Sequence, residues 1–279
     1  MGEIFLGTEA LASGQVTRHG LQTRYRKVHQ NVYATKGFEF TPRDQAVAAW
    51  LWSDRRASLA GHSAAAIFGS RWLPADAPAE LSRFYRSSAR GIVIHTGQIA
   101  GDELMTVGGM SCTTVARTGY DLGRRLPFQS AVIRIDALLN ATGGRVADIA
   151  AIAERYPGAR GIRRLRRALE FVDGGSESPQ ETRLRLLLVQ AGLPRPETQI
   201  PEGRRRIDMG YRQWKVAIEY DGEQHWTDPR QHAEDIERLE FLASRRWVVI
   251  RVSAEQLRRR PHEVVERVRR ALRAAGCPI

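Results

Sequence analysis

Cysteine is scarce in this chain: there are two among 279 residues, Cys112 and Cys277, and they lie far apart in the sequence. Neither stands near a cluster of histidines, so the pattern predicts no disulfide scaffold and no zinc site, as in a reducing cytosol. No run approaches the roughly 18 apolar residues that a membrane-spanning helix needs. The first residues, MGEIFLGTEALASG, lack the apolar stretch of a secretory signal peptide, and repeats are absent. We therefore expect a soluble, cytoplasmic protein without a membrane segment.

Acidic residues are outnumbered by basic ones, with 31 Asp and Glu against 43 Lys and Arg, a formal net charge of +12. Most of the excess is arginine, whose planar guanidinium favours bidentate contact with phosphates. The charge indicates an acidic partner, nucleic acid first; a basic but otherwise ordinary surface is the alternative, because net charge concerns non-specific binding. With 42% hydrophobic residues, the chain has enough apolar material for ordinary cores.

A change of composition at 173–179, DGGSESP, divides the chain, because Gly, Ser and Pro interrupt the helical pattern there. After it, residue spacing predicts helix 179–191, strands 197–201, 204–210 and 214–221, helix 229–244, strand 247–252 and helix 261–275. Before it, we expect helices 8–14 and 17–26 with Thr17 as N-cap, a ribbon at 28–33, helices 42–53 and 61–69, strands 80–85 and 91–96, and mostly helix over 113–171. We predict three parts, 1–35, 36–173 and 174–279.

Helix, turn, helix and ribbon at the N-terminus form the order of a winged helix-turn-helix, whose second helix can lie in the major groove of DNA. On the predicted helix 17–26 the polar positions, which are the candidates for DNA contact, are Arg18, His19, Gln22, Arg24 and Arg26. Many small helical hairpins carry a basic face, so this pattern alone leaves DNA reading and a merely solvated face open.

The run ALASGQVTRHGLQTRYRKVHQNVYA resembles the N-terminal domain of AbiEi-family antitoxins, the DNA-binding partners in type IV toxin–antitoxin systems. LAGHSAAAIFG (59–69) and SCTTVARTGYDLGR (111–124) are similar to the next segments of that architecture. The resemblance implies DNA binding and a cognate toxin as partner, but its small-residue motifs describe fold rather than activity. We interpret Ser63, beside His62, as a capping or packing residue, and Arg117 with Asp121 as an ion pair on a helix face.

The segment 160–170, RGIRRLRRALE, predicts a helix with one apolar stripe and arginines around the rest. Two interpretations are open: a solvated linker face, or contact with the DNA backbone through Arg163, Arg164 and Arg167. The second is reasonable because the helix lies between the two parts that we expect to touch DNA.

The stretch 207–226, IDMGYRQWKVAIEYDGEQHW, ends an apolar strand in two acids, a turn and a histidine. Side chains alternate along a strand, so Lys215, Ala217, Glu219 and Asp221 project from one face, and Val216, Ile218 and Tyr220 from the other. Asp208, near the end of the preceding strand, would join the acids across a hairpin that turns at 210–213. The alternative is a solvated strand end with an ordinary Asp-Gly turn.

Three carboxylates in such a place, Asp208, Glu219 and Asp221, suit Mg²⁺ or Mn²⁺, which keep waters and meet phosphates. A bound ion would stabilise charge on a scissile phosphate and lower the pKa of an attacking water. His225, just past the turn, is placed to act as general base or as donor to the leaving oxygen. We add Lys215, on the face of the acids, as a candidate contact with nucleic acid.

A helix, then Asp, then Glu-x-(acid or Lys) on an αβββαβ order resembles the PD-(D/E)XK, or restriction-endonuclease-like, nuclease superfamily. More closely, ESPQETRLRLLLVQAGLPRPETQ, RRIDMGY, KVAIEYDGEQH and DIERLEFLASRRWVVIRV are similar in that order to the small endonuclease-like family related to very-short-patch-repair endonucleases. The resemblance covers about residues 177–275 and implies these site residues: Glu181 on the helix, Asp208 as first metal carboxylate, Glu219 and Asp221, then His225. Asp235 and Arg238 match the family's D-x-x-R, which we interpret as a pair that props the sheet.

One position departs from the superfamily: its usual lysine, two residues after the glutamate, is Asp221 here. Whether Lys215 reaches the phosphate instead is open, so activity depends on His225 or is lost. We expect an α+β chain with an N-terminal winged helix-turn-helix, a mostly helical middle region and a restriction-endonuclease-like α/β core. Its expected function is Mg²⁺- or Mn²⁺-dependent cleavage of DNA; the alternatives are a repressor or antitoxin with an inactive nuclease fold, and an RNA nuclease or toxin component. No oligomeric state is predicted.

Overall fold

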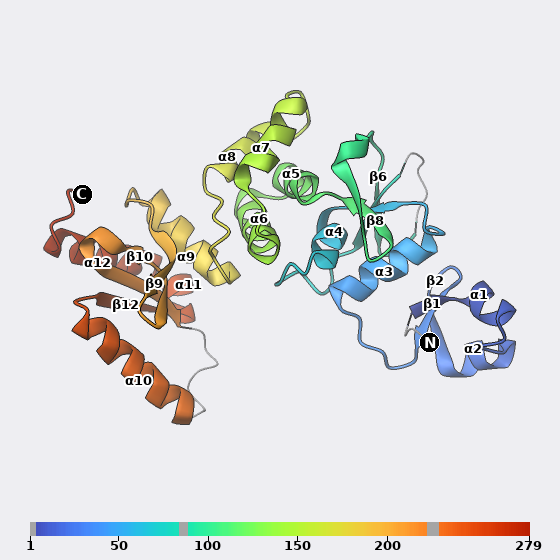
Figure 1. The fold of residues 1–279 in the computed structure, drawn as a ribbon, viewed down its shortest axis with the longest axis horizontal. Helices are drawn as coiled ribbons and strands as arrows, with labels where there is room; N and C mark the ends of the chain where they lie inside the picture. Colours follow the sequence, from blue (N-terminus) through green and yellow to red (C-terminus); the bar gives the residue numbers. More distant parts are fainter. Residues whose placement is uncertain (1–3, 84–88, 222–228) are drawn as a thin grey trace. The chain divides into compact units, whose positions relative to one another are not determined.

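The computed structural model describes residues 4–83, 89–221 and 229–279, without the side chains of 229–233 and 235. It forms two compact units, Met1–Val172 and Asp173–Ile279 (Figure 1). The strands in the described ranges form three sheets, two in the first unit and one in the second, so the α+β class is confirmed. No described helix is long and apolar enough to cross a membrane.

The N-terminal part has the predicted order of two helices and a ribbon. Its elements are β1 (Ile4–Leu6), α1 (Gly7–Ala12), α2 (Arg18–Arg24), β2 (Tyr25–His29) and β3 (Val32–Thr35). Thr17 caps α2 as predicted, because its side-chain oxygen accepts from the amide of Gly20 at 3.0 Å. The helix ends two residues before the predicted end, since Tyr25 and Arg26 pair with β3 instead. A third strand, β1, pairs with β3 and was not predicted.

The rest of the first unit is a five-stranded sheet with helices. Helices α3 (Pro42–Trp52) and α4 (Gly61–Ile67) accompany strands β4 (Ser58–Leu59), β5 (Ala79–Ser82), β6 (Ile92–His95), β7 (Leu104–Val107) and β8 (Met110–Thr113), with the short η1 (Gly101–Glu103), in the sheet order β6-β5-β4-β8-β7. Four helices fill the predicted helical stretch: α5 (Val115–Arg125), α6 (Phe128–Thr142), α7 (Val146–Arg155) and α8 (Ile162–Leu169). Strands β5 and β6 were predicted, whereas the two-residue β4 and the hairpin of β7 and β8 were not.

Charged side chains are buried inside this unit. The predicted ion pair of Arg117 and Asp121 is present at 3.1 Å, but it is buried and shared with Glu103 instead of lying on a solvated face. Ser63 packs as predicted: its hydroxyl accepts from the amide of Glu80 at 2.8 Å. Burial alone would raise the pKa of the Glu80 carboxyl, but hydrogen bonds from two histidines lower it well below its usual value.

The second unit confirms the predicted αβββαβ order. Its elements are α9 (Pro179–Gln190), β9 (Glu197–Glu202), β10 (Arg205–Tyr211), η2 (Arg212–Trp214), β11 (Val216–Asp221), α10 (Pro229–Ser244), β12 (Val248–Ser253), α11 (Ala254–Arg259) and α12 (Pro261–Ala274). The sheet order is β12-β11-β10-β9; β11 and β12 are parallel and the other neighbours antiparallel. Among the described elements of this unit, the short α11 and the single turn η2 were not predicted.

Helices cover both faces of this sheet (Figure 1). Val216 and Ile218 of β11 pack in a core with residues of α9 and α12, whereas Ala217 packs with Leu242 of α10. The predicted alternation of β11 is therefore correct, and it directs Glu219 towards the face that α10 covers.

Candidate functional site

Asp208 lies where the pairing of β10 with β11 stops. The two strands pair only from Met209 to Tyr211, and the described ladder ends at Met209 opposite Ile218. Beyond this point β11 pairs with β12 on its other side, as far as Asp221. The carboxylate of Asp208 accepts from the amide of Tyr220 at 3.3 Å. The structure thus brings Asp208 to the end of β11, beside Glu219.

A backbone irregularity accompanies Asp208. The ladder between β9 and β10 passes from Ile207–Ile200 to Met209–Thr198, and Gln199 between them has a positive φ of 51°. Ile207 packs with the residues of α10, whereas Met209 packs in the core on the other face. Regular alternation would put both on one face, so the strand changes face at Asp208.

The hairpin turns later than predicted. Gly210 and Tyr211 belong to β10, and the turn is formed by Arg212–Trp214 with Lys215 in the left-handed region, at a φ of 50°. Gly210 is needed for close pairing and not for the turn: a Cβ there would lie 2.5 Å from the carbonyl oxygen of Val216. Lys215 contacts Glu202 at 3.2 Å and lies over the ring of Trp247, at the opposite end of β11 from Asp221.

Glu181 is placed by the N-terminus of α9. Ser178 caps that helix, because its side chain accepts from the backbone amide of Glu181. The Glu181 carboxylate accepts from the backbone amide of Glu177 at 2.8 Å, and it lies 3.5 Å from the side-chain amide nitrogen of Gln199. Burial, and to a smaller extent the negative charge of Asp208, raise the pKa of Glu181 to about 6. Its carboxyl therefore exchanges a proton close to neutral pH.

Arginines contact the two acids of β11. Arg238 of α10 lies 2.8 Å from Glu219 and 4.0 Å from Asp208, and it also donates to the backbone carbonyl of Arg206. Arg251 of β12 lies 2.8 Å from Asp221. Sequence reasoning had interpreted Arg238 only as a prop and missed Arg251, although a single charge within the apolar run VVIRV was a visible signal. The side chain of Asp235 is outside the described residues.

The donor chemistry suits a divalent ion. Glu181, Asp208, Glu219 and Asp221 all offer carboxylate oxygens, the ligands that Mg²⁺ and Mn²⁺ prefer. Burial raises the pKa of Asp208 as well as that of Glu181, so their charged forms are disfavoured in the protein alone, and a nearby cation would stabilise them. Among the described side chains no three His, Cys, Asp or Glu residues are grouped to hold an ion. His225, the remaining predicted site residue, lies outside the described residues.

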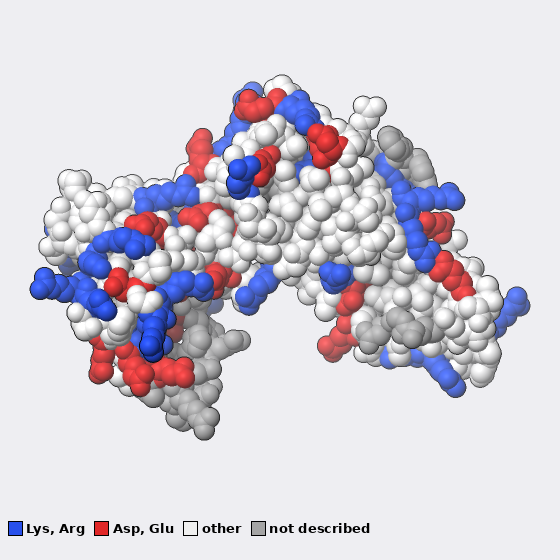
Figure 2. Space-filling view, viewed as in Figure 1, with Lys and Arg blue, Asp and Glu red and all other residues white. Residues whose placement is uncertain are grey.

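The candidate DNA contacts of the first unit are exposed on two helices and a strand. Arg18, His19, Gln22 and Arg24 are exposed on α2, Arg26 is exposed on β2, and Arg163, Arg164 and Arg167 are exposed on α8. Two of the α8 arginines also contact protein: Arg164 donates to the carbonyls of Arg125 and Leu126, and Arg167 lies over the ring of Phe128. Figure 2 shows that Lys and Arg side chains on the visible face are interspersed with acids.

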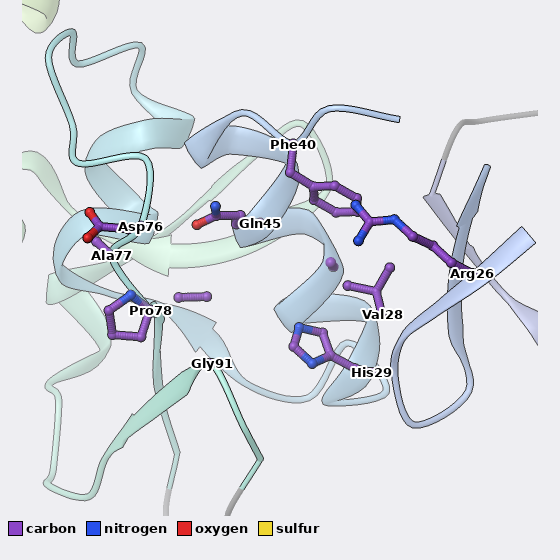
Figure 3. Close-up of a pocket in the computed structure, with 11 residues that line it drawn as sticks. Arg26, Val28, His29, Phe40, Gln45, Asp76, Ala77, Pro78 and Gly91 are labelled. Atoms are coloured by element: carbon purple, nitrogen blue, oxygen red, sulfur yellow. The ribbon is translucent and has the colours of Figure 1, made fainter. Parts of the chain in front are cut away.

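Arg26 belongs to a pocket. Its guanidinium lies 4.8 Å from the ring centre of Phe40 and donates to the carbonyl of Phe38. Both Arg26 and Phe40 line a pocket of about 360 Å³, which also includes His29 and Gln45 (Figure 3). Burial lowers the pKa of His29. Arg26 is therefore partly held by protein contacts, unlike a freely extending side chain on α2.

Known proteins resemble the chain in two ways. Residues 181–272 match the family model REase_MTES_1575, a restriction-endonuclease-like family, and this range contains all five predicted catalytic residues. Two proteins of Mycobacterium tuberculosis, uncharacterized protein MT2308 of strain CDC 1551 / Oshkosh and uncharacterized protein Rv2248 of strain ATCC 25618 / H37Rv, are each 30% identical over 187 residues. The aligned region covers 65% of this chain and 68% of each relative. The chain belongs to the family of these mycobacterial proteins. No solved structure matches it.

The family-model match supports a nuclease-like domain in the C-terminal unit of this family member. Nuclease-type chemistry, hydrolysis of a nucleic acid, is thus supported at the level of the domain. The resemblances to AbiEi antitoxins and to very-short-patch-repair endonucleases stay predictions.

Proposed function

We propose that the protein is an endonuclease that hydrolyses phosphodiester bonds of DNA with Mg²⁺ or Mn²⁺. The observation that carries the proposal is the approach of Asp208 to the end of β11, close to Glu219. Glu181, whose pKa is raised, is also near Asp208, and all three acids belong to a nuclease-like domain. Buried carboxylates with raised pKa values at one edge of a sheet are typical of a site that handles cations and protons.

Each acid has a distinct place in the proposed reaction. Asp208 and Glu219, with Asp221 beside them, would hold the ion, which supplies charge stabilisation at phosphorus and a lower pKa for the attacking water. Glu181 is suited to accept a proton from that water, because its pKa of about 6 is close to neutral pH. His225 stays a proposed general base or proton donor to the leaving oxygen.

The first unit would deliver the nuclease to DNA. In this proposal residues 1–35 are a winged helix-turn-helix that reads DNA with α2, residues 36–173 an AbiEi-like middle region, and residues 174–279 the nuclease. The basic α8 would add contacts with the phosphate backbone, which depend on salt. We propose that the protein acts in the cytoplasm.

A second function has one observation in its favour. Arginines contact Glu219 and Asp221 at 2.8 Å, so both acids of β11 have counter-ions within the protein. Such pairing suits a DNA-binding repressor or antitoxin whose nuclease fold is an inactive scaffold and whose partner is a cognate toxin.

Cleavage by the purified full chain separates the two. Supercoiled plasmid and mismatched duplexes are incubated with the protein in Mg²⁺ or Mn²⁺, beside Asp208→Ala, with circular dichroism to show that both fold. We expect nicking by the wild type and a loss of at least about a hundredfold in the variant. Equal cleavage by the variant, or none by a folded wild type, would refute the nuclease. In the latter case, salt-dependent binding to the DNA upstream of its own gene would favour the repressor.

A further inference from the structure

The candidate nuclease site is short of the basic residue that a lysine two positions after Glu219 would supply. That position is Asp221, which is paired with Arg251. Lys215, on the same strand face by simple alternation, lies at the hairpin turn with Glu202 and Trp247. A cation for the phosphate must therefore come from another element of the fold.

Arg238 is a cation that lies beside two acids of the site, Glu219 and Asp208. It reaches them from α10, which covers this face of the sheet, and its guanidinium is 2.8 Å from Glu219 and 4.0 Å from Asp208. The side chain of Glu219 is 5% exposed, whereas that of Arg238 is 25% exposed. The guanidinium thus contacts a buried acid while part of the arginine side chain is exposed.

The shape of this guanidinium suits a phosphate. Arg238 lies beside two carboxylates, Glu219 and Asp208, whereas Asp221 is paired with Arg251. A guanidinium has five N–H donors in a planar fork, more than one carboxylate uses. Those that remain can bind two oxygens of a phosphate.

We propose that Arg238 is the basic residue of this nuclease site and binds the phosphate group that is cleaved, an inference that rests on the proposed function. Arg251 is less suited, because it contacts Asp221 on the far side of β11 from β10, whereas Arg238 lies near acids of both β10 and β11. A phosphate drawn to an ion on Asp208 and Glu219 would meet Arg238 at the same place.

The test uses DNA affinity as well as cleavage. The full-length wild type, Arg238→Gln, Arg238→Lys and the control Arg212→Gln are compared; Arg212 also pairs with a glutamate, but at the exposed turn of the hairpin. Affinity for duplex DNA is measured in EDTA and in Ca²⁺, an ion with similar oxygen ligands, and cleavage is measured in Mn²⁺. Thermal unfolding shows whether each variant is folded.

We expect Ca²⁺ to tighten DNA binding by the wild type and by Arg212→Gln, and Arg238→Gln to lose this gain together with about a hundredfold in cleavage rate. Arg238→Lys keeps the positive charge and should therefore recover part of the Ca²⁺ gain in DNA binding and part of the cleavage rate. An arginine that only supports the fold would not be expected to show this recovery. Retention of the Ca²⁺ effect by folded Arg238→Gln, or no Ca²⁺ effect in the wild type, overturns the role of Arg238. If the wild type shows the effect and Arg238→Gln loses it, but the wild type does not cleave, the nuclease proposal fails and the phosphate contact stands.

Discussion

Replacement of Glu181 by glutamine should stabilise the C-terminal unit at neutral pH. The carboxyl is buried and has its pKa raised from 4.5 to about 6 by burial first, with Asp208 adding to it. A raised pKa in the folded state means that ionisation of Glu181 opposes folding. Glutamine has nearly the same shape and keeps an oxygen to accept from the amide of Glu177, so it removes the charge and little else.

The size of the effect follows from the shift. A rise from 4.5 to about 6 corresponds to about 2 kcal/mol of unfolding free energy. The folded protein binds the proton more tightly than the unfolded chain, so this penalty is present above pH 6, shrinks as the pH falls through 6 and is absent below about 4.5. The advantage of Glu181→Gln over the wild type should therefore be about 2 kcal/mol at about pH 8 and much smaller at about pH 4.5.

Urea unfolding of the full chain by pulse proteolysis, with fragments of 173–279 identified by mass spectrometry, measures this difference. Glu197→Gln is the control, because Glu197 is exposed on β9 and pairs with Arg212. We expect no comparable step with pH in the control. An advantage of Glu181→Gln that is equal at both pH values, or larger in acid, would refute the reasoning from burial.

Three further predictions concern other parts of the chain. Gly210→Ala should destabilise the C-terminal unit by about 2 kcal/mol in urea unfolding, because the new methyl group would meet the backbone of β11 at 2.5 Å. Glu80→Gln should lower the unfolding free energy of the first unit by about 2 kcal/mol at neutral pH. The substitution breaks charge-assisted hydrogen bonds with His62 and His95 that hold the pKa of Glu80 low. Because strong acid protonates Glu80 in the wild type too, thermal unfolding should show the stability difference between wild type and variant fading there. Arg18→Ala should weaken DNA binding and reduce its dependence on log salt by about one unit in titrations at several salt concentrations; an unchanged slope would contradict a phosphate contact.

Local pattern was sufficient for most elements of the second unit. Its helices have regular apolar spacing, and its strands are six or seven residues long, long enough for alternation to show. The same alternation correctly separated Val216 and Ile218 from Ala217 and Glu219. In the first unit the strands β4, β7 and β8 have two to four residues. The pairing of β4 is long-range, as between Leu59 and Cys112. Strands β7 and β8 instead form a local hairpin across Gly108 and Gly109, a turn signal that sequence reasoning overlooked.

The acids Asp208, Glu219 and Asp221 could be named from strand order, alternation and resemblance, because each depends on its own strand. Their counter-ions could not, because Arg238 and Arg251 come from α10 and β12 and reach the acids only once those elements pack against β11. Tertiary structure likewise decided that Lys215 is a turn residue. Sequence alone thus named the acids at this edge of the sheet. The fold decided their charge balance and pKa values, since burial and ion pairing depend on contacts between elements that are distant in the chain.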